Sequence, residues 1–275
     1  MTRAIGVDLS HWDVSFDPEK AMGRIDFAIM KASEGIYKDP KFAEIWSGVQ
    51  KVPIRGAYHY LRSGWTWQKQ VDFFWGAVKN YPFHFYVLDF ESTGNVLNAG
   101  FAAMASFWMY HIHEKAGGKA VLLYTNPNHY TVDLMPYGDW MKNYPLWLAQ
   151  YYTTKPSPEK APALPAKRAA GDWKIWQWAS EINYPGHGKE YGTGSYSVDL
   201  DAYNGTPGEM ATWLKAVVPP IPRDKLARIK TAWMKRGKSG SRGAGLLMAG
   251  DCEGEGDTVP IGRRPRRDSN PRSRP

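Results

Sequence analysis

Eight short runs rich in β-branched and aromatic residues recur along residues 1–218, and they constrain the fold more than any other feature. Their length and composition are typical of β-strands. Longer stretches with apolar residues at helical spacing separate several of them, as in Trp67–Lys79 and Phe101–Lys115. Strands that alternate with helices favour parallel pairing. The runs are Ala4–Leu9, Phe27–Ala32, Ile54–Tyr60, Phe85–Phe90, Ala120–Tyr124, Leu146–Gln150, Lys174–Trp178 and Ser197–Asp201.

This pattern predicts an α/β fold in the form of a TIM-like (β/α) barrel. Eight strand–helix units in about 200 residues make a short barrel by the usual size of this fold. Some connections, such as Thr153–Gly171, are too rich in proline to form a full helix. We therefore expect an irregular barrel in which some helices are missing.

A cluster of prolines marks the end of the expected barrel. Pro219, Pro220 and Pro222 stop any element that precedes them. Twelve of the 13 tryptophans lie before this point, and glycine, serine, arginine and proline dominate near the end of the chain. Such a segment buries too little apolar surface to offset its chain entropy. We therefore expect a folded barrel at residues 1–218 and a basic, disordered tail at residues 219–275.

The whole net charge of +8 lies in this tail. Residues 1–218 hold 21 basic and 21 acidic side chains, whereas residues 219–275 hold 14 and 6. A balanced barrel does not provide the basic face of a nucleic-acid-binding protein, so we do not expect nucleic acid as a partner. The tail is either a solvated extension, which we favour, or a segment that attracts anionic polymers. Non-specific binding of nucleic acid is the third alternative.

Composition also excludes several classes of protein. No apolar run approaches the roughly 18 residues that span a bilayer, so we expect no membrane span. The single cysteine, Cys252, can form neither an internal disulfide nor a zinc site built from cysteines. His111 and His113 would project about 200° apart on a helix and would not share a metal ion. We expect no metal and no cofactor.

Four acidic residues fall at or near the ends of expected strands, where barrel enzymes carry their active sites. Asp8 closes the first strand, Asp89 and Glu91 end the fourth, and Asp199 lies in the eighth. Strand residues two apart share a face, so we expect Asp89 and Glu91 to lie side by side. A carboxyl group among apolar neighbours and other carboxylates keeps its proton near neutral pH, as a general acid for glycosidic cleavage must. Any one of the four could instead cap a loop or a helix.

Aromatic residues gather at the same strand ends. Rings that carry a polar group stack on sugar faces and form hydrogen bonds at their edges, which favours a carbohydrate ligand. The alternative for each ring is a place in the hydrophobic core, and Trp147 and Trp176 fit that alternative well. The rings at or near the strand ends are Tyr58, Tyr60, Tyr124, Trp147, Tyr151, Trp176 and Trp178.

Eight short motifs occur in a fixed order over about residues 1–205. They are Gly6–Trp12, Phe27–Gly35, Arg55–Tyr60, Leu88–Glu91, Leu123–Asn126, Leu146–Tyr151, Trp176–Trp178 and Val198–Asp201. In this order the chain resembles glycoside hydrolase family 25, the Chalaropsis-type lysozymes or N-acetylmuramidases. One such motif would be weak evidence, whereas eight in order are specific.

The resemblance implies cleavage of the β-1,4 bond between N-acetylmuramic acid and N-acetylglucosamine in bacterial peptidoglycan. It implies that Glu91 is the general acid and that Asp89 assists the acetamido group of the substrate. Asp8 and Asp199 match the other two acidic residues of the family's site. The residues that we expect to bind substrate are Tyr58, Tyr60, Tyr124, Gln150, Tyr151, Trp176 and Asp201.

Two positions depart from the family's pattern and bear on the choice of substrate. Asp13 stands where many members carry glutamine or asparagine, and Asp201 stands where asparagine is frequent. Two other functions remain open, a peptidoglycan-binding module without turnover and a chitinase-like glycosidase. The complete set of four acidic residues argues against the first of these.

The expected partners are peptidoglycan glycan strands, with anionic wall polymers as a second candidate partner of the tail. The first eight residues lack the apolar stretch of a secretory signal. We therefore expect synthesis in the cytoplasm and action on the bacterial wall after release, as for a phage endolysin.

Overall fold

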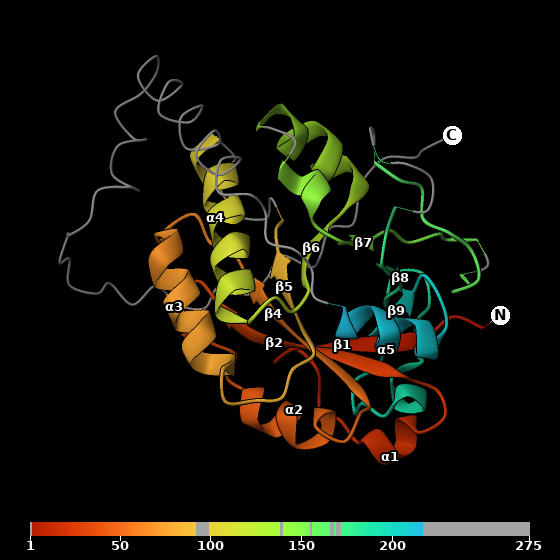
Figure 1. Cartoon of the computed structure of the whole chain (residues 1–275). Helices are drawn as coiled ribbons and strands as arrows, with labels where there is room; N and C mark the ends of the chain where they lie inside the picture. Colours follow the sequence, from red (N-terminus) through yellow and green to blue (C-terminus); the bar gives the residue numbers. More distant parts are fainter. Residues whose placement is uncertain are drawn as a thin grey trace.

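Eight strands close into a barrel in which β1 pairs with both β2 and β9 (Figure 1). The structure is a computed structural model that describes residues 2–91, 99–137, 140–154, 156–165, 168 and 172–216. Each of the eight expected strands is present, so the prediction of an α/β barrel is confirmed. Going round the barrel, the strands are β1 (Ile5–Leu9), β2 (Phe27–Glu34), β4 (Ile54–Tyr60), β5 (Phe85–Asp89), β6 (Val121–Thr125), β7 (Leu146–Ala149), β8 (Ile175–Ala179) and β9 (Asp199–Tyr203). The short strand β3 (Tyr37–Lys38) forms a hairpin with β2 outside the ring.

Regular helices cover only part of the outer wall, as the sequence predicts. The α-helices are α1 (Pro18–Ala21), α2 (Phe42–Val49), α3 (Trp67–Val78), α4 (Ala99–Lys115) and α5 (Pro207–Lys215). Helices α3 and α4 lie side by side (Figure 1). In its described residues, the β6–β7 connection has only the π-helical turn η1 (His129–Leu134) and the 3-10 turns η2 (Met135–Tyr137) and η3 (Trp140–Asn143). No helix occurs in the described residues between β7 and β8.

The expectation that all strands are parallel is wrong for β9. This strand runs antiparallel to both β8 and β1. A parallel return needs a crossover that carries the chain back along the barrel, usually a helix. The segment between β8 and β9 contains only the 3-10 turn η4 (Gly188–Tyr191), so β9 starts at the rim where β8 ends. Asp199, its first residue, therefore lies at the carboxyl-terminal rim of the other strands.

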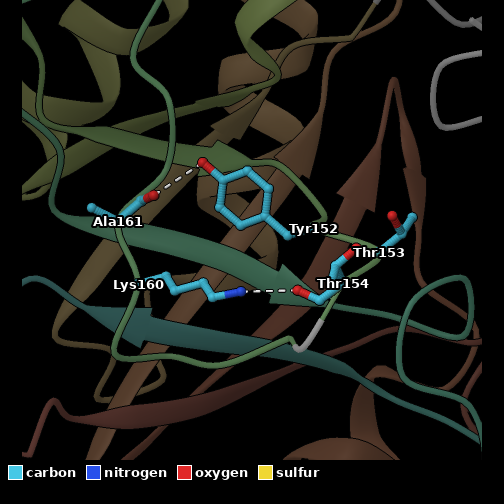
Figure 2. Close-up of a pocket in the computed structure, with 5 residues that line it drawn as sticks. All are labelled: Tyr152, Thr153, Thr154, Lys160 and Ala161. Atoms are coloured by element: carbon cyan, nitrogen blue, oxygen red, sulfur yellow. Dashed lines mark hydrogen bonds between the residues drawn. The ribbon is translucent and has the colours of Figure 1, made fainter. Parts of the chain in front are cut away.

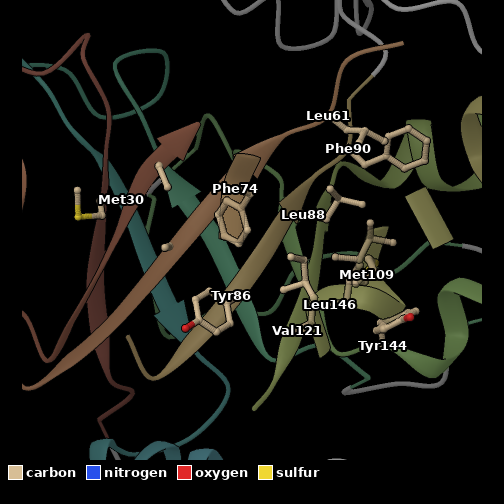
Figure 3. Close-up of a cluster of buried hydrophobic side chains, with 14 of the residues drawn as sticks. Met30, Leu61, Phe74, Tyr86, Leu88, Phe90, Met109, Val121, Tyr144 and Leu146 are labelled. Carbon is tan, nitrogen blue, oxygen red and sulfur yellow. The ribbon is translucent and has the colours of Figure 1, made fainter. Parts of the chain in front are cut away.

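Two apolar clusters separate the interior of the barrel from its outer wall, and alternation along each strand assigns residues to one or the other. On β5, Phe85 and Val87 belong to the interior cluster, whereas Tyr86 and Leu88 belong to the larger outer cluster. The outer cluster joins strand residues such as Leu88 to Phe74 of α3 and Met109 of α4 (Figure 3). Residue parity on a strand thus predicts which side chains reach the interior.

Helix α5 packs against the interior cluster and closes the amino-terminal end of the barrel. Thr206 and Glu209 form a reciprocal capping box at its start, which satisfies backbone donors there. Met210 is fully buried in the interior cluster. The opposite, carboxyl-terminal rim is therefore the end that can receive a ligand.

Two further expectations concern the tail and a membrane span. The tail predicted at residues 219–275 lies outside the described residues. Among the described helices, none is long and apolar enough to span a membrane.

Candidate active site

Asp89 and Glu91 stand at the end of β5 on the open rim. Asp89 is 2% exposed and follows Phe85 and Val87 on the interior face. Backbone pairing continues past it on both sides, since Leu61 N donates to Asp89 O and Phe90 N donates to Tyr124 O, both at 3.0 Å. The chain is thus still extended where Glu91 begins, and Glu91 is partly exposed. This geometry is consistent with the expected pair of carboxyl groups on one face.

Asp8 and Asp199 lie opposite each other across β1 and β9. Asp8 is buried, and Asp199 is partly exposed at the rim. The reversed direction of β9 creates this pairing, because it places the start of β9 next to the end of β1. We refer to Asp8, Asp89, Glu91 and Asp199 as the carboxylate rim.

Two tyrosines lie level with Asp89. The register aligns Tyr60 with Asp89 across β4 and β5, and Asp89 with Tyr124 across β5 and β6. Tyr151 follows β7 and is partly exposed. Tyr58 lies one step deeper, where its ring meets that of Trp147 edge-on at 6.4 Å. Tyr60, Tyr124 and Tyr151 therefore border the carboxylate rim, whereas Tyr58 packs in the interior.

Gln177 links this rim together, although the sequence analysis did not select it. It is fully buried on β8. Its Nε2 donates to Asp8 Oδ2 at 2.5 Å and to Asp199 Oδ2 at 3.1 Å. Its Oε1 accepts hydrogen bonds from the hydroxyls of Tyr124, at 2.8 Å, and Tyr151. The alternation along β8 could have indicated it, because Gln177 comes two residues after Ile175 and therefore also faces the interior.

A second group of charges, also not selected from the sequence, lies beside Tyr60. Glu34 forms ion pairs with both Lys31 and Arg62, and Lys31 is 1% exposed. The Arg62 guanidinium lies 4.7 Å from the centre of the Tyr60 ring. Burial opposes ionisation of Glu34, but the two cations outweigh it and lower the pKa of Glu34 to about 2. This cluster is therefore a fixed network of charges next to the carboxylate rim.

Three expected substrate-binding residues form hydrogen bonds within the protein. By the alternation of their strands, Gln150 and Trp176 face the outer wall of the barrel. Gln150 Oε1 accepts hydrogen bonds from Tyr152 OH and Ala163 N. Trp176 Nε1 donates a hydrogen bond to Gln150 O. Asp201 is fully buried and accepts a hydrogen bond from Trp147 Nε1 at 2.7 Å. The burial of Trp176 and Asp201 favours packing roles for them, whereas Gln150 is partly exposed next to Tyr151 at the end of β7. Substrate binding by these three residues stays a prediction.

A hollow of about 560 Å³ opens beside the rim, just after Tyr151 (Figure 2). One loop lines it, with Tyr152 OH donating to Ala161 O at 3.0 Å and Lys160 Nζ donating to Thr154 O at 2.9 Å. None of its lining residues is acidic. It therefore shares no lining residue with the carboxylate rim. In the described part of the chain, no three histidine, cysteine or acidic residues are arranged to hold a metal ion.

A closed barrel with acidic side chains at its carboxyl-terminal rim places these groups where barrel enzymes carry their active sites, but the same fold hosts many chemistries. Comparison with known proteins gives the family. The family model for glycosyl hydrolases family 25 matches residues 7–187. The chain therefore belongs to glycosyl hydrolases family 25, as the motifs indicate.

Individual relatives agree with this assignment. An autolytic lysozyme of Clostridium acetobutylicum is 27% identical over 158 residues, which cover 55% of this chain and 46% of the relative. The match thus spans less than half the length of that protein. A family 25 glycosyl hydrolase from Bacillus anthracis has a TM-score of 0.60 and 22% identity, covering 76% of this chain and 92% of its own. A muramidase from Acremonium alcalophilum also has a TM-score of 0.60 and 22% identity, covering 78% and 99%.

Proposed function

We propose that this protein is a lysozyme that cleaves bacterial peptidoglycan at the β-1,4 bond between N-acetylmuramic acid and N-acetylglucosamine. The observation that carries the proposal is the interior-facing Asp89 with Glu91 two residues after it at the open end of β5. Membership of family 25 and the similarity to an autolytic lysozyme and a muramidase support it. The substrate is then a glycan strand that lies across the carboxylate rim.

Glu91 is the general acid in this proposal. It protonates the glycosidic oxygen, the bond to the anomeric carbon breaks, and the leaving sugar departs with the proton. Its partial exposure supports the role, since it allows contact with both substrate and water. The ionised Glu91 then takes a proton from the water that completes hydrolysis.

Asp89 assists the acetamido group of the substrate. Its carboxylate orients that group as the acetamido oxygen attacks the anomeric carbon and forms a cyclic intermediate. Asp8 and Asp199 add negative charge where the sugar ring becomes positive. The alternative is a single inverting displacement in which one of the aspartates activates water. NMR of the first-formed product distinguishes the two routes, because the substrate-assisted route retains the anomeric configuration.

The test is mass spectrometry of fragments released from purified peptidoglycan by the wild type and by Glu91→Gln. We expect new reducing ends that carry muramic acid, and a loss of about 10²–10⁴-fold in rate for the variant. Glu114→Gln, which changes an exposed glutamate of α4, is the matched control and should keep full activity.

Each other outcome points to a different function. Reducing ends that carry N-acetylglucosamine would indicate a chitinase-like specificity. A folded wild type that sediments with the wall but releases no fragments would favour a binding module. Full activity of Glu91→Gln would refute its assignment as the acid.

A further inference from the structure

Gln177 is the meeting point of four side chains that belong to the proposed site. Its amide nitrogen lies within hydrogen-bond distance of two carboxylates, those of Asp8 and Asp199. Its amide oxygen receives two phenol hydroxyls, those of Tyr124 and Tyr151. The four partners come from β1, β9, β6 and the segment after β7, so one side chain connects four parts of the rim.

This pattern of partners fixes the orientation of the amide. A carboxylate only accepts hydrogen bonds, so the amide group that faces Asp8 and Asp199 must be the donating NH₂. The carbonyl oxygen then faces the two tyrosines and accepts from both. A flipped amide would bring its oxygen against two carboxylates and lose both charge-assisted bonds.

The backbone holds Gln177 in place on both sides. It pairs with Ala149 of β7 and with Asp201 of β9. Its carbonyl accepts a hydrogen bond from Gln150 N at 3.1 Å, and a register irregularity in the β8–β9 pairing follows it. The side chain thus extends from a rigid part of the sheet to the carboxylates.

We propose that Gln177 is a positioning residue that keeps Asp8 and Asp199 ionised and oriented toward the rim. The inference rests on the proposed function, because it assigns these two aspartates to charge stabilisation in the reaction. A neutral side chain is required, since it must donate at one end and accept at the other. Hydrogen bonds to a carboxylate favour its charged form, and a third acid at this point would favour protonation.

Several ionisable groups share this environment and will titrate together with the pair. Facing Gln177 from the strands around it are Asp8, Asp199, Asp201, Tyr124 and Tyr151, and further along the rim lie Asp89, Glu91, Lys31, Glu34 and Arg62. The experiment therefore compares variants over a pH range and does not rely on one pH.

The decisive variant is Gln177→Glu, which has nearly the same shape. Ionised glutamate lacks the donor and adds a charge, whereas protonated glutamate can donate to Asp8 and accept from the tyrosines. We expect kcat to fall about 100-fold at pH 7. We expect most of the loss relative to wild type to be recovered as the pH falls to 4, with a smaller change in KM. Gln68→Glu, an exposed glutamine of α3, is the matched control and should follow the wild-type profile.

A second variant and a readout without substrate separate this inference from the proposed function. In Gln177→Met, which removes both donor and acceptor, carbon-13 NMR titration should show the pKa values of Asp8 and Asp199 raised by about one unit. If the wild type releases no wall fragments, the proposed function fails, yet this titration still decides the role of Gln177.

Two results would overturn the inference. One is a Gln177→Glu variant whose activity relative to wild type is the same at every pH. The other is a folded Gln177→Met variant in which both aspartates titrate as in the wild type.

Discussion

Asp8 and Asp199 lie directly opposite each other on the antiparallel strands β1 and β9, so two carboxylates occupy one cross-strand pair. Like charges in such a pair destabilise a sheet. Gln177 donates a hydrogen bond to each of them and offsets part of this repulsion. The sheet is therefore locally destabilised at the rim where the proposed chemistry takes place.

Replacing one of these carboxylates should stabilise the fold while it harms activity. For Asp199→Asn we expect the free energy of unfolding at pH 7 to rise by about 0.5–1 kcal/mol, because the repulsion with Asp8 is removed. Urea denaturation measures this change, and a peptidoglycan assay measures the loss of activity. Asp72→Asn, an exposed aspartate of α3, is the control and should change stability little. Lower stability of Asp199→Asn would contradict the idea that the pair is repulsive.

Glu34 should contribute stability that depends on pH. Its folded-state pKa is about 2, below the ordinary value of 4.5, so its stabilisation is present above pH 4.5 and is lost as the pH falls toward 2. Glu34→Gln leaves the buried Lys31 without this counter-charge, and we expect a loss of about 3 kcal/mol at pH 7. The difference from wild type should shrink between pH 4.5 and pH 2, as measured by urea denaturation.

A double variant controls for this interpretation. Lys31→Met with Glu34→Gln removes the buried charge as well, and it should recover much of the stability lost in the single variant. A single variant whose deficit is equally large at pH 2 and pH 7 would show that the ion pairs are not its cause.

Trp176 should affect stability and not substrate affinity. It is fully buried, and its ring packs against Tyr152 and Trp173 on the outer wall. We expect Trp176→Phe to lower the free energy of unfolding by about 2 kcal/mol, through a lost hydrogen bond and a cavity, with KM changed less than about twofold. Urea denaturation and peptidoglycan kinetics on the same preparation measure both. A large rise in KM at unchanged stability would instead support substrate binding by Trp176.

The basic tail should matter for wall binding only at low salt. Truncation after residue 218 removes the entire excess positive charge. If the tail attracts anionic wall polymers, the truncated protein should co-sediment with walls less than the full chain does at low ionic strength. Near 1 M salt the two should bind equally, because charges are then screened within about 3 Å. A full-length variant with Arg263, Arg264, Arg266 and Arg267 changed to glutamine tests charge separately from length. Equal binding of all three proteins at low salt would leave the tail as a solvated extension.

The sequence predicted the elements of this barrel well because each depends on local signals. All eight strands appear within two residues of their expected starts, since β-branched and aromatic residues mark them. The position of Asp89 at the end of a strand could also be predicted, because the strongly apolar run Phe85–Leu88 precedes it. The motif order was sufficient to identify the family.

The direction of β9 depended on tertiary structure. It follows from how the chain returns after β8, and the alternating pattern of earlier strands and helices gave no warning of the change. That direction brings Asp199 beside Asp8 and moves Asp201 into the interior. Neither consequence could be read from residues 197–201 alone.

The faces of β7 and β8 were also decided in three dimensions. Trp176, Gln177 and Trp178 are all buried, so composition does not reveal which of them faces the interior. Only closure of the barrel turns Gln177 toward the carboxylates and Trp176 toward the outer wall. The sequence by itself determined which segments form strands and which family they belong to, because those signals are local and ordered. The direction of a strand and the face to which its side chains point depend on long-range pairing. These two properties determine which side chains meet at the rim.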